Sequence, residues 1–163
     1  QVIFQRKGNR STSTVAVSGE AAIARTRVER STEDASMFNT LLVEDNVSFR
    51  QALSDILIAY FPSIDVDEAG NGEEALSKVD YQRPNLIFMD VQLPGENGLE
   101  VTRKIKRVYS DIVVVILTSY GPPEYRQQAF QNGADCFLLK EDDACMDNIL
   151  ARVEREIARE SCH

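Results

Sequence analysis

Short apolar runs alternate with longer stretches of helical periodicity from residue 37 onward. Runs of this length, bounded by turn-forming or polar residues, predict β-strands at residues 40–43, 86–89, 112–117 and 136–139, and an alternating stretch predicts a further strand at 64–69. Between and after these runs, apolar residues recur every three to four positions, which predicts five amphipathic helices. Strands that alternate with helices predict an α/β domain with a doubly wound, five-stranded parallel sheet, covered by helices on both faces because each crossover returns on the same hand.

Residue patterns predict which strands lie at the edge and at the centre of the sheet, and where two of the helices begin or end. Residues 64–69 alternate polar and apolar side chains, as an edge strand does, whereas residues 112–117 are apolar throughout and predict the most deeply buried strand. Pro62 ends the first helix. The fourth helix begins at Pro122-Pro123 and ends at Asn132-Gly133, since proline suits a first helical turn and glycine suits the residue after the last turn.

We expect the apolar faces of the helices to pack on the sheet, and in three helices these faces are extensive. In the first helix this face comprises Phe49, Leu53, Ile56, Leu57 and Tyr60. The third helix, capped by Asn97, has Val101, Ile105 and Val108 on its apolar face and Arg103, Lys104, Lys106 and Arg107 on its solvent face. The last helix, capped by Asp142 or Asp143, packs through Met146, Ile149, Leu150, Val153 and Ile157.

Polar side chains follow or end four of the predicted strands. Glu44 and Asp45 follow the first strand, and Asp90 follows the third. Thr118 ends the fourth strand, and Lys140 follows the fifth. Because the carboxyl ends of parallel strands share one edge of the sheet, where ligands bind in such folds, we expect these side chains to converge.

This set of side chains suits phosphoryl transfer onto a carboxylate. Three carboxylates in one pocket repel one another unless a cation lies among them, and hard oxygen ligands of this kind suit Mg²⁺. A lysine and a hydroxyl opposite the metal can bind the remaining oxygens of a transferring phosphoryl group. Asp90, at the tip of a buried central strand, is the first candidate for the acceptor.

With these motifs in order, the chain resembles the receiver domains of two-component response regulators. The resemblance is carried by Glu44-Asp45, by the segment Met89-Asp90-Val91-Gln92-Leu93-Pro94-Gly95-Glu96-Asn97-Gly98, by Leu117-Thr118-Ser119, and by Gly133-Ala134-Asp135-Cys136-Phe137-Leu138-Leu139-Lys140. It covers roughly residues 37–157, is specific because the motifs come in order on the expected strand ends, and implies a flavodoxin-like fold.

The resemblance also implies a role for each matching residue. Asp90 would be the phosphoacceptor and Lys140 would pair with the phosphoryl group. Thr118 would be the switch hydroxyl, and Phe137 would be the aromatic switch residue. The ligands of Mg²⁺ would be Glu44, Asp45, Asp90 and the backbone carbonyl of Gln92.

The implied function is a phosphorylation-dependent switch rather than an enzyme. A sensor histidine kinase or a phosphotransfer protein would be the donor, and self-dephosphorylation would be slow. Phosphorylation would change the face formed by the helix at 122–132, the strand at 136–139 and the last helix, for a second copy or an output domain. We expect Tyr120 to lean over the site and slow hydrolysis, and Gln92 to be the residue that could orient the attacking water.

One position departs from the usual receiver pattern. The lysine is usually followed by a cis proline, whereas Glu141 follows Lys140 here, which leaves the isomer of this peptide bond open. A lysine followed by an acid also occurs in receivers of NarL-type transcription factors. That similarity implies a DNA-binding domain after the receiver. The sequence ends at His163, just past the fifth predicted helix, and contains no such domain.

Other functions fit the residues less well. A receiver-like scaffold that binds partners without phosphate is the main alternative. A flavodoxin-like FMN module needs a Ser/Thr/Gly-rich phosphate loop after the first strand, where this chain has Glu44-Asp45-Asn46, which would repel phosphate. A haloacid-dehalogenase-type phosphatase has its nucleophile on the first strand within an Asp-x-Asp pair, whereas Asp90 is on the third.

Composition adds limits to this interpretation. The formal net charge of −8 argues against direct binding of nucleic acid, because phosphate backbones require a basic surface. The three cysteines, Cys136, Cys145 and Cys162, form no CxxC pair and indicate reduced thiols, and Cys162 with His163 makes a poor metal site. No stretch approaches the ~18 apolar residues of a membrane span, and no signal peptide is evident. We therefore expect a soluble, cytoplasmic protein with no membrane partner.

Residues 1–36 differ from the rest of the chain. They hold six Lys or Arg against four acids and show no sustained period, apart from a possible short helix over 19–30. We expect a flexible extension that is either an artificial leader or lies upstream of a natural start at Met37, with a basic partner-binding arm as the alternative. The receiver domain is then predicted over 37–160.

Overall fold

The computed structural model describes residues 37–162, and our expectations for residues 1–36 and for His163 lie outside them. The strands are β1 (Phe38–Val43), β2 (Ile64–Ala69), β3 (Leu86–Met89), β4 (Val113–Thr118) and β5 (Cys136–Leu139). The helices are α2 (Val47–Tyr60), α3 (Gly72–Gln82), α4 (Gly98–Val108), α5 (Pro123–Gln131) and α6 (Cys145–Ser161). Each predicted strand and helix in this range is therefore present. None of the described helices is both long and apolar enough to cross a bilayer.

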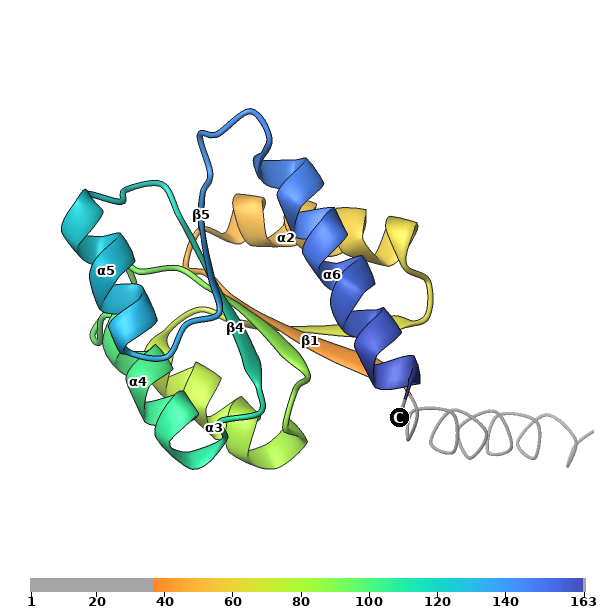
Figure 1. Ribbon diagram of the computed structural model, residues 1–163, viewed down its shortest axis with the longest axis horizontal. Coiled ribbons are helices and arrows are strands. Elements are labelled where there is room, and N and C mark those ends of the chain that lie inside the picture. The colour runs from red at the N-terminus through yellow and green to blue at the C-terminus, as the bar shows by residue number, and fades with distance from the viewer. Residues whose placement is uncertain (1–36, 163) are drawn as a thin grey trace, which may run out of the picture. The chain divides into compact units, whose positions relative to one another are not determined.

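The five strands form one parallel sheet in the order β2-β1-β3-β4-β5. Helices α2 and α6 cover one face of the sheet, and α3, α4 and α5 cover the other (Figure 1). The prediction of a doubly wound α/β fold is confirmed. The predicted edge strand β2 lies at an edge, and β4, predicted to be the most deeply buried strand, has every residue buried.

Each face of the sheet has its own hydrophobic core. Val114 and Ile116 of β4 point toward α3, α4 and α5, whereas Val113, Val115 and Leu117 point toward α2 and α6. This alternation along a strand that is apolar on both faces is the expected pattern for a parallel sheet between two helical layers. Burial on both faces fixes the register of the strands, and so fixes where each one ends.

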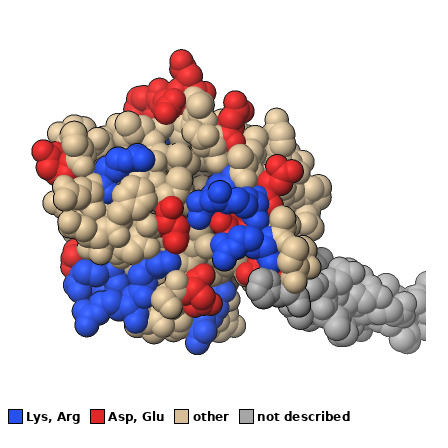
Figure 2. All heavy atoms as spheres, viewed as in Figure 1, with Lys and Arg blue, Asp and Glu red and all other residues tan. Residues whose placement is uncertain are grey.

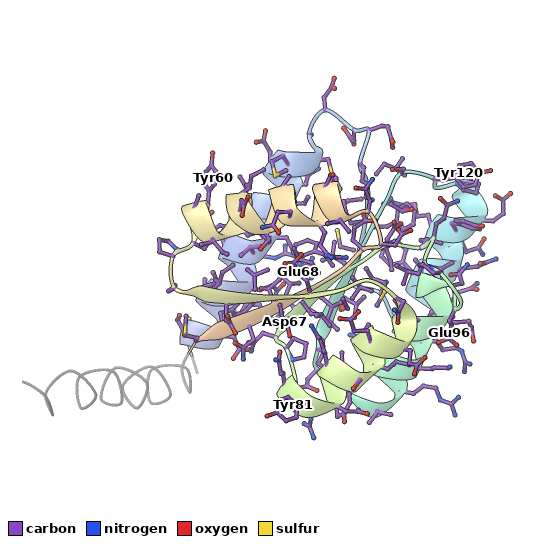
Figure 3. All side chains as sticks on the ribbon, turned by 180° about the vertical axis from the view of Figure 1, so that it is seen from behind. Tyr60, Asp67, Glu68, Tyr81, Glu96 and Tyr120 are labelled. Atoms are coloured by element: carbon purple, nitrogen blue, oxygen red, sulfur yellow. The ribbon has the colours of Figure 1, made fainter. Side chains whose placement is uncertain are left out.

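The edge strand β2 is tied to its neighbours by charged pairs. Lys78 of α3 lies 2.9 Å from the Asp67 carboxylate, and Arg50 of α2 lies 2.7 Å from Glu68. Burial raises the pKa of Asp67, but hydrogen bonds from the Lys78 ammonium and from the Glu68 N–H outweigh it and lower that pKa below its ordinary value. Figure 3 shows Asp67 and Glu68 on this outer strand.

Several helix ends match the predictions, and one does not. Asn97 caps α4 by accepting a hydrogen bond from the Leu99 N–H, and Asn132 ends α5 before Gly133, which has φ +98°. The prediction that Asp142 or Asp143 caps the last helix is wrong, because Ala144 is the N-cap of α6 and makes no side-chain cap bond. The Asp142 carboxylate instead accepts from the N–H of Ala144 itself, so it supports the turn before the helix.

The predicted faces of α2 and α4 need correction at three positions. Tyr60 and Val108 are 65% and 69% exposed, and each is the last residue of its helix. The basic residues of α4 do reach the surface in Figure 2, but the Lys106 side chain is only 14% exposed. Its ammonium lies 3.0 Å from Asp135 and donates to the carbonyl of Ile112.

Candidate functional site

Paired strand ends bring the predicted side chains to one edge of the sheet. Val43 and Met89 are paired in register, so Glu44 and Asp90 leave adjacent strands at the same level. The Asp90 N–H donates to the Val43 carbonyl at 3.0 Å. On the other side, the Lys140 N–H donates to the carbonyl of Thr118 at 2.9 Å. The convergence expected from the topology is therefore present in the backbone itself.

Three carboxylates meet at this edge. Oxygen atoms of Glu44, Asp45 and Asp90 lie within 4.8 Å of one another. Glu44 and Asp90 are buried, at 5% and 7% exposure, whereas Asp45 is exposed at the mouth of the site. Grouped oxygen donors of this kind fit a hard divalent cation, because the cation would offset their mutual repulsion.

Lys140 is the cation that faces these acids. Its ammonium forms a close ion pair with Glu44 and lies 3.5 Å from an oxygen of Asp90, and its side chain is 12% exposed. Burial raises the pKa of Glu44, although hydrogen bonds from the Lys140 ammonium and from the Asn46 N–H act against this shift. No cis peptide bond occurs among the described residues, so the bond from Lys140 to Glu141 is trans.

Gln92 lies in the turn that follows the acceptor strand. Its N–H donates to Asp90 Oδ1 at 3.3 Å, and its side chain is exposed. The turn is held close to Asp90 by Gly98, because a Cβ at Gly98 would lie 1.8 Å from the Asp90 carbonyl oxygen. The Gly98 N–H closes the turn by donating to the carbonyl of Val91 at 2.8 Å.

Thr118 is fully buried, and its hydroxyl is engaged with the segment that follows it. The hydroxyl donates to the carbonyl of Tyr120 at 3.3 Å and accepts from the N–H of the same residue at 3.4 Å. Tyr120 is 56% exposed and lies at the surface (Figure 3). The centroid of its ring is 5.9 Å from that of Tyr125 of α5, and the two ring planes are perpendicular, at 89°. This contact holds Tyr120 against α5, and the shielding role expected for it stays a prediction.

Phe137 of β5 is turned into the protein, with 5% exposure. It fits under Gly121, where an added Cβ would lie 2.8 Å from the Phe137 ring. The guanidinium carbon of Arg126, on α5, lies 5.7 Å from the centroid of the same ring. The aromatic ring and the Thr118 hydroxyl therefore belong to neighbouring strands and to one connected region.

Two residues at this edge were missed as site residues by sequence reasoning. Arg50 donates to the Glu44 carbonyl and to the Glu68 carboxylate, each at 2.7 Å, and so ties the acidic turn to β2. Phe49 was assigned only to the apolar face of its helix, yet its ring centroid lies 4.2 Å from the Lys140 ammonium. Their place in the first turn of α2, directly after Glu44-Asp45, was the available signal.

The fold and the site define a flavodoxin-like α/β domain with an acidic, lysine-bearing site at the carboxyl edge of its sheet. Comparison with known families names this class. The response regulator receiver domain model matches residues 40–154, and the chain therefore belongs to the receiver domains of two-component systems. The resemblance inferred from the motifs is confirmed.

Individual relatives agree with the family. The chain is 34% identical over 105 residues to the transcriptional regulatory protein DegU of Brevibacillus brevis, a match that covers 64% of this chain and 44% of DegU. It is 37% identical over 106 residues to the DNA-binding transcriptional activator DevR/DosR of Mycobacterium tuberculosis, covering 64% of this chain and 48% of that protein. The chain thus spans about half the length of these relatives.

A solved structure supports the fold. The CheY-like receiver domain protein of Methanospirillum hungatei has a TM-score of 0.69 and 22% identity, covering 77% of this chain and 98% of that one. At this identity the likeness concerns the fold alone. It agrees with the sheet order and the helical layers described above.

Proposed function

We propose that this chain is a phosphorylation-dependent switch that accepts a phosphoryl group on Asp90. The observation that carries the proposal is the meeting of Asp90 with Glu44, Asp45 and the Lys140 ammonium at one sheet edge. Glu44 and Asp90 are buried beside Asp45, and holding like charges together is costly, which supports a functional use for this cluster. Membership in the receiver family supports the same function.

Magnesium is the cofactor that the donors fit. The carboxylates of Glu44, Asp45 and Asp90 and the backbone carbonyl of Gln92 would hold it, and all four are the hard oxygen donors that Mg²⁺ takes. When bound, Mg²⁺ supplies positive charge beside the phosphoryl oxygens during transfer. Asp45 is the exposed carboxylate of the three, so metal and donor would enter from its side.

The residues of the chain then perform the transfer step. An Asp90 carboxylate oxygen attacks the phosphorus of a phosphohistidine, the new O–P bond forms as the P–N bond breaks, and the departing imidazole nitrogen keeps the electron pair and takes up a proton. The Lys140 ammonium, 3.5 Å from Asp90, is close enough to pair with the oxygens of the incoming group. Its charge also lowers the repulsion between the carboxylate and the anionic donor.

The phosphorylated site would be sensed by Thr118. Phosphoryl oxygens are stronger acceptors than the Tyr120 carbonyl, to which the hydroxyl now donates at 3.3 Å. Turning the hydroxyl toward Asp90 releases the segment of Tyr120 and Gly121, which covers the Phe137 ring. Because Phe137 is already buried, we propose that the switch is partly tilted toward its active form before phosphorylation.

The partner surface follows from these connections. The donor would be a sensor histidine kinase or a phosphotransfer protein. The face formed by α5, β5 and α6 would carry the change to a second copy or to an output domain. DegU is a transcriptional regulatory protein and DevR/DosR a DNA-binding transcriptional activator, which makes a DNA-binding output domain the first candidate.

Incubation with acetyl phosphate and Mg²⁺, followed by intact mass measurement, tests the proposal. We expect one added phosphoryl group in the wild-type protein, and none in Asp90→Asn or in wild type with excess chelator. A wild-type protein that takes no phosphoryl group from acetyl phosphate or from any histidine kinase would favour the phosphate-independent scaffold instead.

A further inference from the structure

The Lys140 ammonium is enclosed by three groups rather than by two. It forms ion pairs with carboxylate oxygens of Glu44 and Asp90, and the centroid of the Phe49 ring lies 4.2 Å from it. The Lys140 side chain is 12% exposed, so little of it remains for water. An ammonium has three N–H donors, and an aromatic face is the one apolar surface that attracts such a charge.

The start of α2 aims this ring. The Asn46 side chain caps the helix by accepting from the Phe49 N–H at 3.0 Å. The Asn46 N–H in turn donates to Glu44 Oε2 at 3.0 Å, while Lys140 pairs with the other oxygen of Glu44. One short segment therefore fixes both the carboxylate and the ring that face Lys140.

We propose that Phe49 is a positioning residue for Lys140 in phosphoryl transfer, an inference that rests on the proposed function. During transfer the ammonium must exchange its pairing with Glu44 for pairing with phosphoryl oxygens beside Asp90. The ring attracts the ammonium without a directed bond, so this attraction matters most in the transition state, when the contact with Glu44 has loosened. It keeps the ammonium at the site while the carboxylate contact loosens.

A purely structural role is the competing explanation. Phe49 is half-buried and packs with the core residues under α2, so its loss could act through packing alone. The two roles differ in their dependence on Lys140. Packing is lost whatever residue stands at 140, whereas positioning has no effect once the ammonium is gone.

The test measures the phosphorylation rate against acetyl phosphate concentration at saturating Mg²⁺. The proteins are wild type, Phe49→Leu, Phe49→Tyr, Lys140→Met and the double variant Phe49→Leu with Lys140→Met. Phe61→Leu, a half-buried phenylalanine at the other end of α2, is the matched control. Mg²⁺ affinity is measured separately on each protein.

We expect Phe49→Leu to lower the maximal rate between about threefold and thirtyfold, the range of a cation–π contact converted to a rate ratio, with Mg²⁺ affinity unchanged. Phe49→Tyr keeps the aromatic face and should stay within about twofold of wild type. In the Lys140→Met background, Phe49→Leu should have no further effect. Phe61→Leu should leave the rate as in wild type.

Two results would overturn this inference and leave the proposed function intact. One is a wild type that becomes phosphorylated while Phe49→Leu has the same phosphorylation rate. The other is an equal fall in rate on Phe49→Leu in the wild-type and the Lys140→Met backgrounds. If Lys140→Met reacts too slowly to measure, the same cycle is followed by urea unfolding. Equal shifts of the Phe49→Leu midpoint in both backgrounds then count against the inference. A wild type that takes no phosphoryl group would instead overturn the proposed function, and this inference with it.

Discussion

Replacing Asp45 with asparagine removes one negative charge from the acidic cluster while keeping the shape of the side chain. The cluster oxygens lie within 4.8 Å of one another, and at that distance a charge pair repels by about 0.9 kcal/mol in a water-like dielectric. Asp45 is exposed, so the water-like value applies to both of its pairs. The nearby Lys140 ammonium offsets part of the repulsion, which leaves a net gain of about 1 kcal/mol for Asp45→Asn without metal.

Thermal unfolding in chelator and in rising Mg²⁺ measures this effect. In chelator, Asp45→Asn should melt about 3–6 °C above wild type at low salt. Mg²⁺ should stabilise wild type more, because losing a ligand weakens binding, and a tenfold weaker affinity removes about 1.4 kcal/mol at saturation. The order of the two melting temperatures should therefore reverse as Mg²⁺ rises.

Asp65→Asn is the control for net charge, since Asp65 is exposed on β2 and its loss changes the charge equally. It should show no reversal. A lower melting temperature for Asp45→Asn in chelator would mean that Asp45 supports the fold rather than strains it, and the electrostatic account of the cluster would be refuted.

Three further variants test other parts of the structure. Gly98→Ala should cost about 2–4 kcal/mol of unfolding free energy, because its Cβ would lie 1.8 Å from the Asp90 carbonyl oxygen; a loss below about 1 kcal/mol in urea unfolding would contradict this packing. Gly121→Ala should displace the Phe137 ring, 2.8 Å from the added Cβ, at a cost of about 1 kcal/mol, and a crystal structure with an unmoved ring would show otherwise. Asp67→Asn should cost about 0.5–1 kcal/mol at neutral pH. Because folding lowers the pKa of Asp67, its contribution to stability is fully present above the ordinary pKa of 3.8 and is lost as pH falls through the folded pKa. A difference in melting temperature between wild type and Asp67→Asn that does not change with pH would refute this assignment.

The fold was predictable because the hydrophobic pattern and the connection rule are both strong signals. Short apolar or alternating strands, separated by amphipathic helices, leave little choice but a parallel sheet between two helical layers. Apart from Lys106, which lies within α4, the wrong positions lie at element ends. Tyr60 and Val108 continue the apolar period of their helices, but each is exposed at the last position of its helix, and a local period does not encode where the covering core ends. The α6 cap was wrong for a similar reason, since the Asp142 carboxylate serves the turn instead.

The site was predictable as far as strand ends determine it. Asp90, Thr118 and Lys140 were placed from topology alone, because strand ends in a parallel sheet share an edge. Side-chain geometry within that edge was not predictable. The Phe49 ring over Lys140 and the Arg50 bond to the Glu44 carbonyl depend on how α2 leaves the sheet, and only three-dimensional structure shows it.

Chemical trapping of the phosphorylated residue tests the central claim most directly. An aspartyl phosphate is an acyl phosphate, and borohydride reduces it to the alcohol homoserine with release of phosphate, whereas unmodified carboxylates are unchanged. After reaction with acetyl phosphate and Mg²⁺, reduction and peptide mapping should place homoserine at Asp90 and at no other acid. Homoserine at Glu44, Asp45 or any other acid, with Asp90 intact, would contradict the assignment of Asp90 as the acceptor.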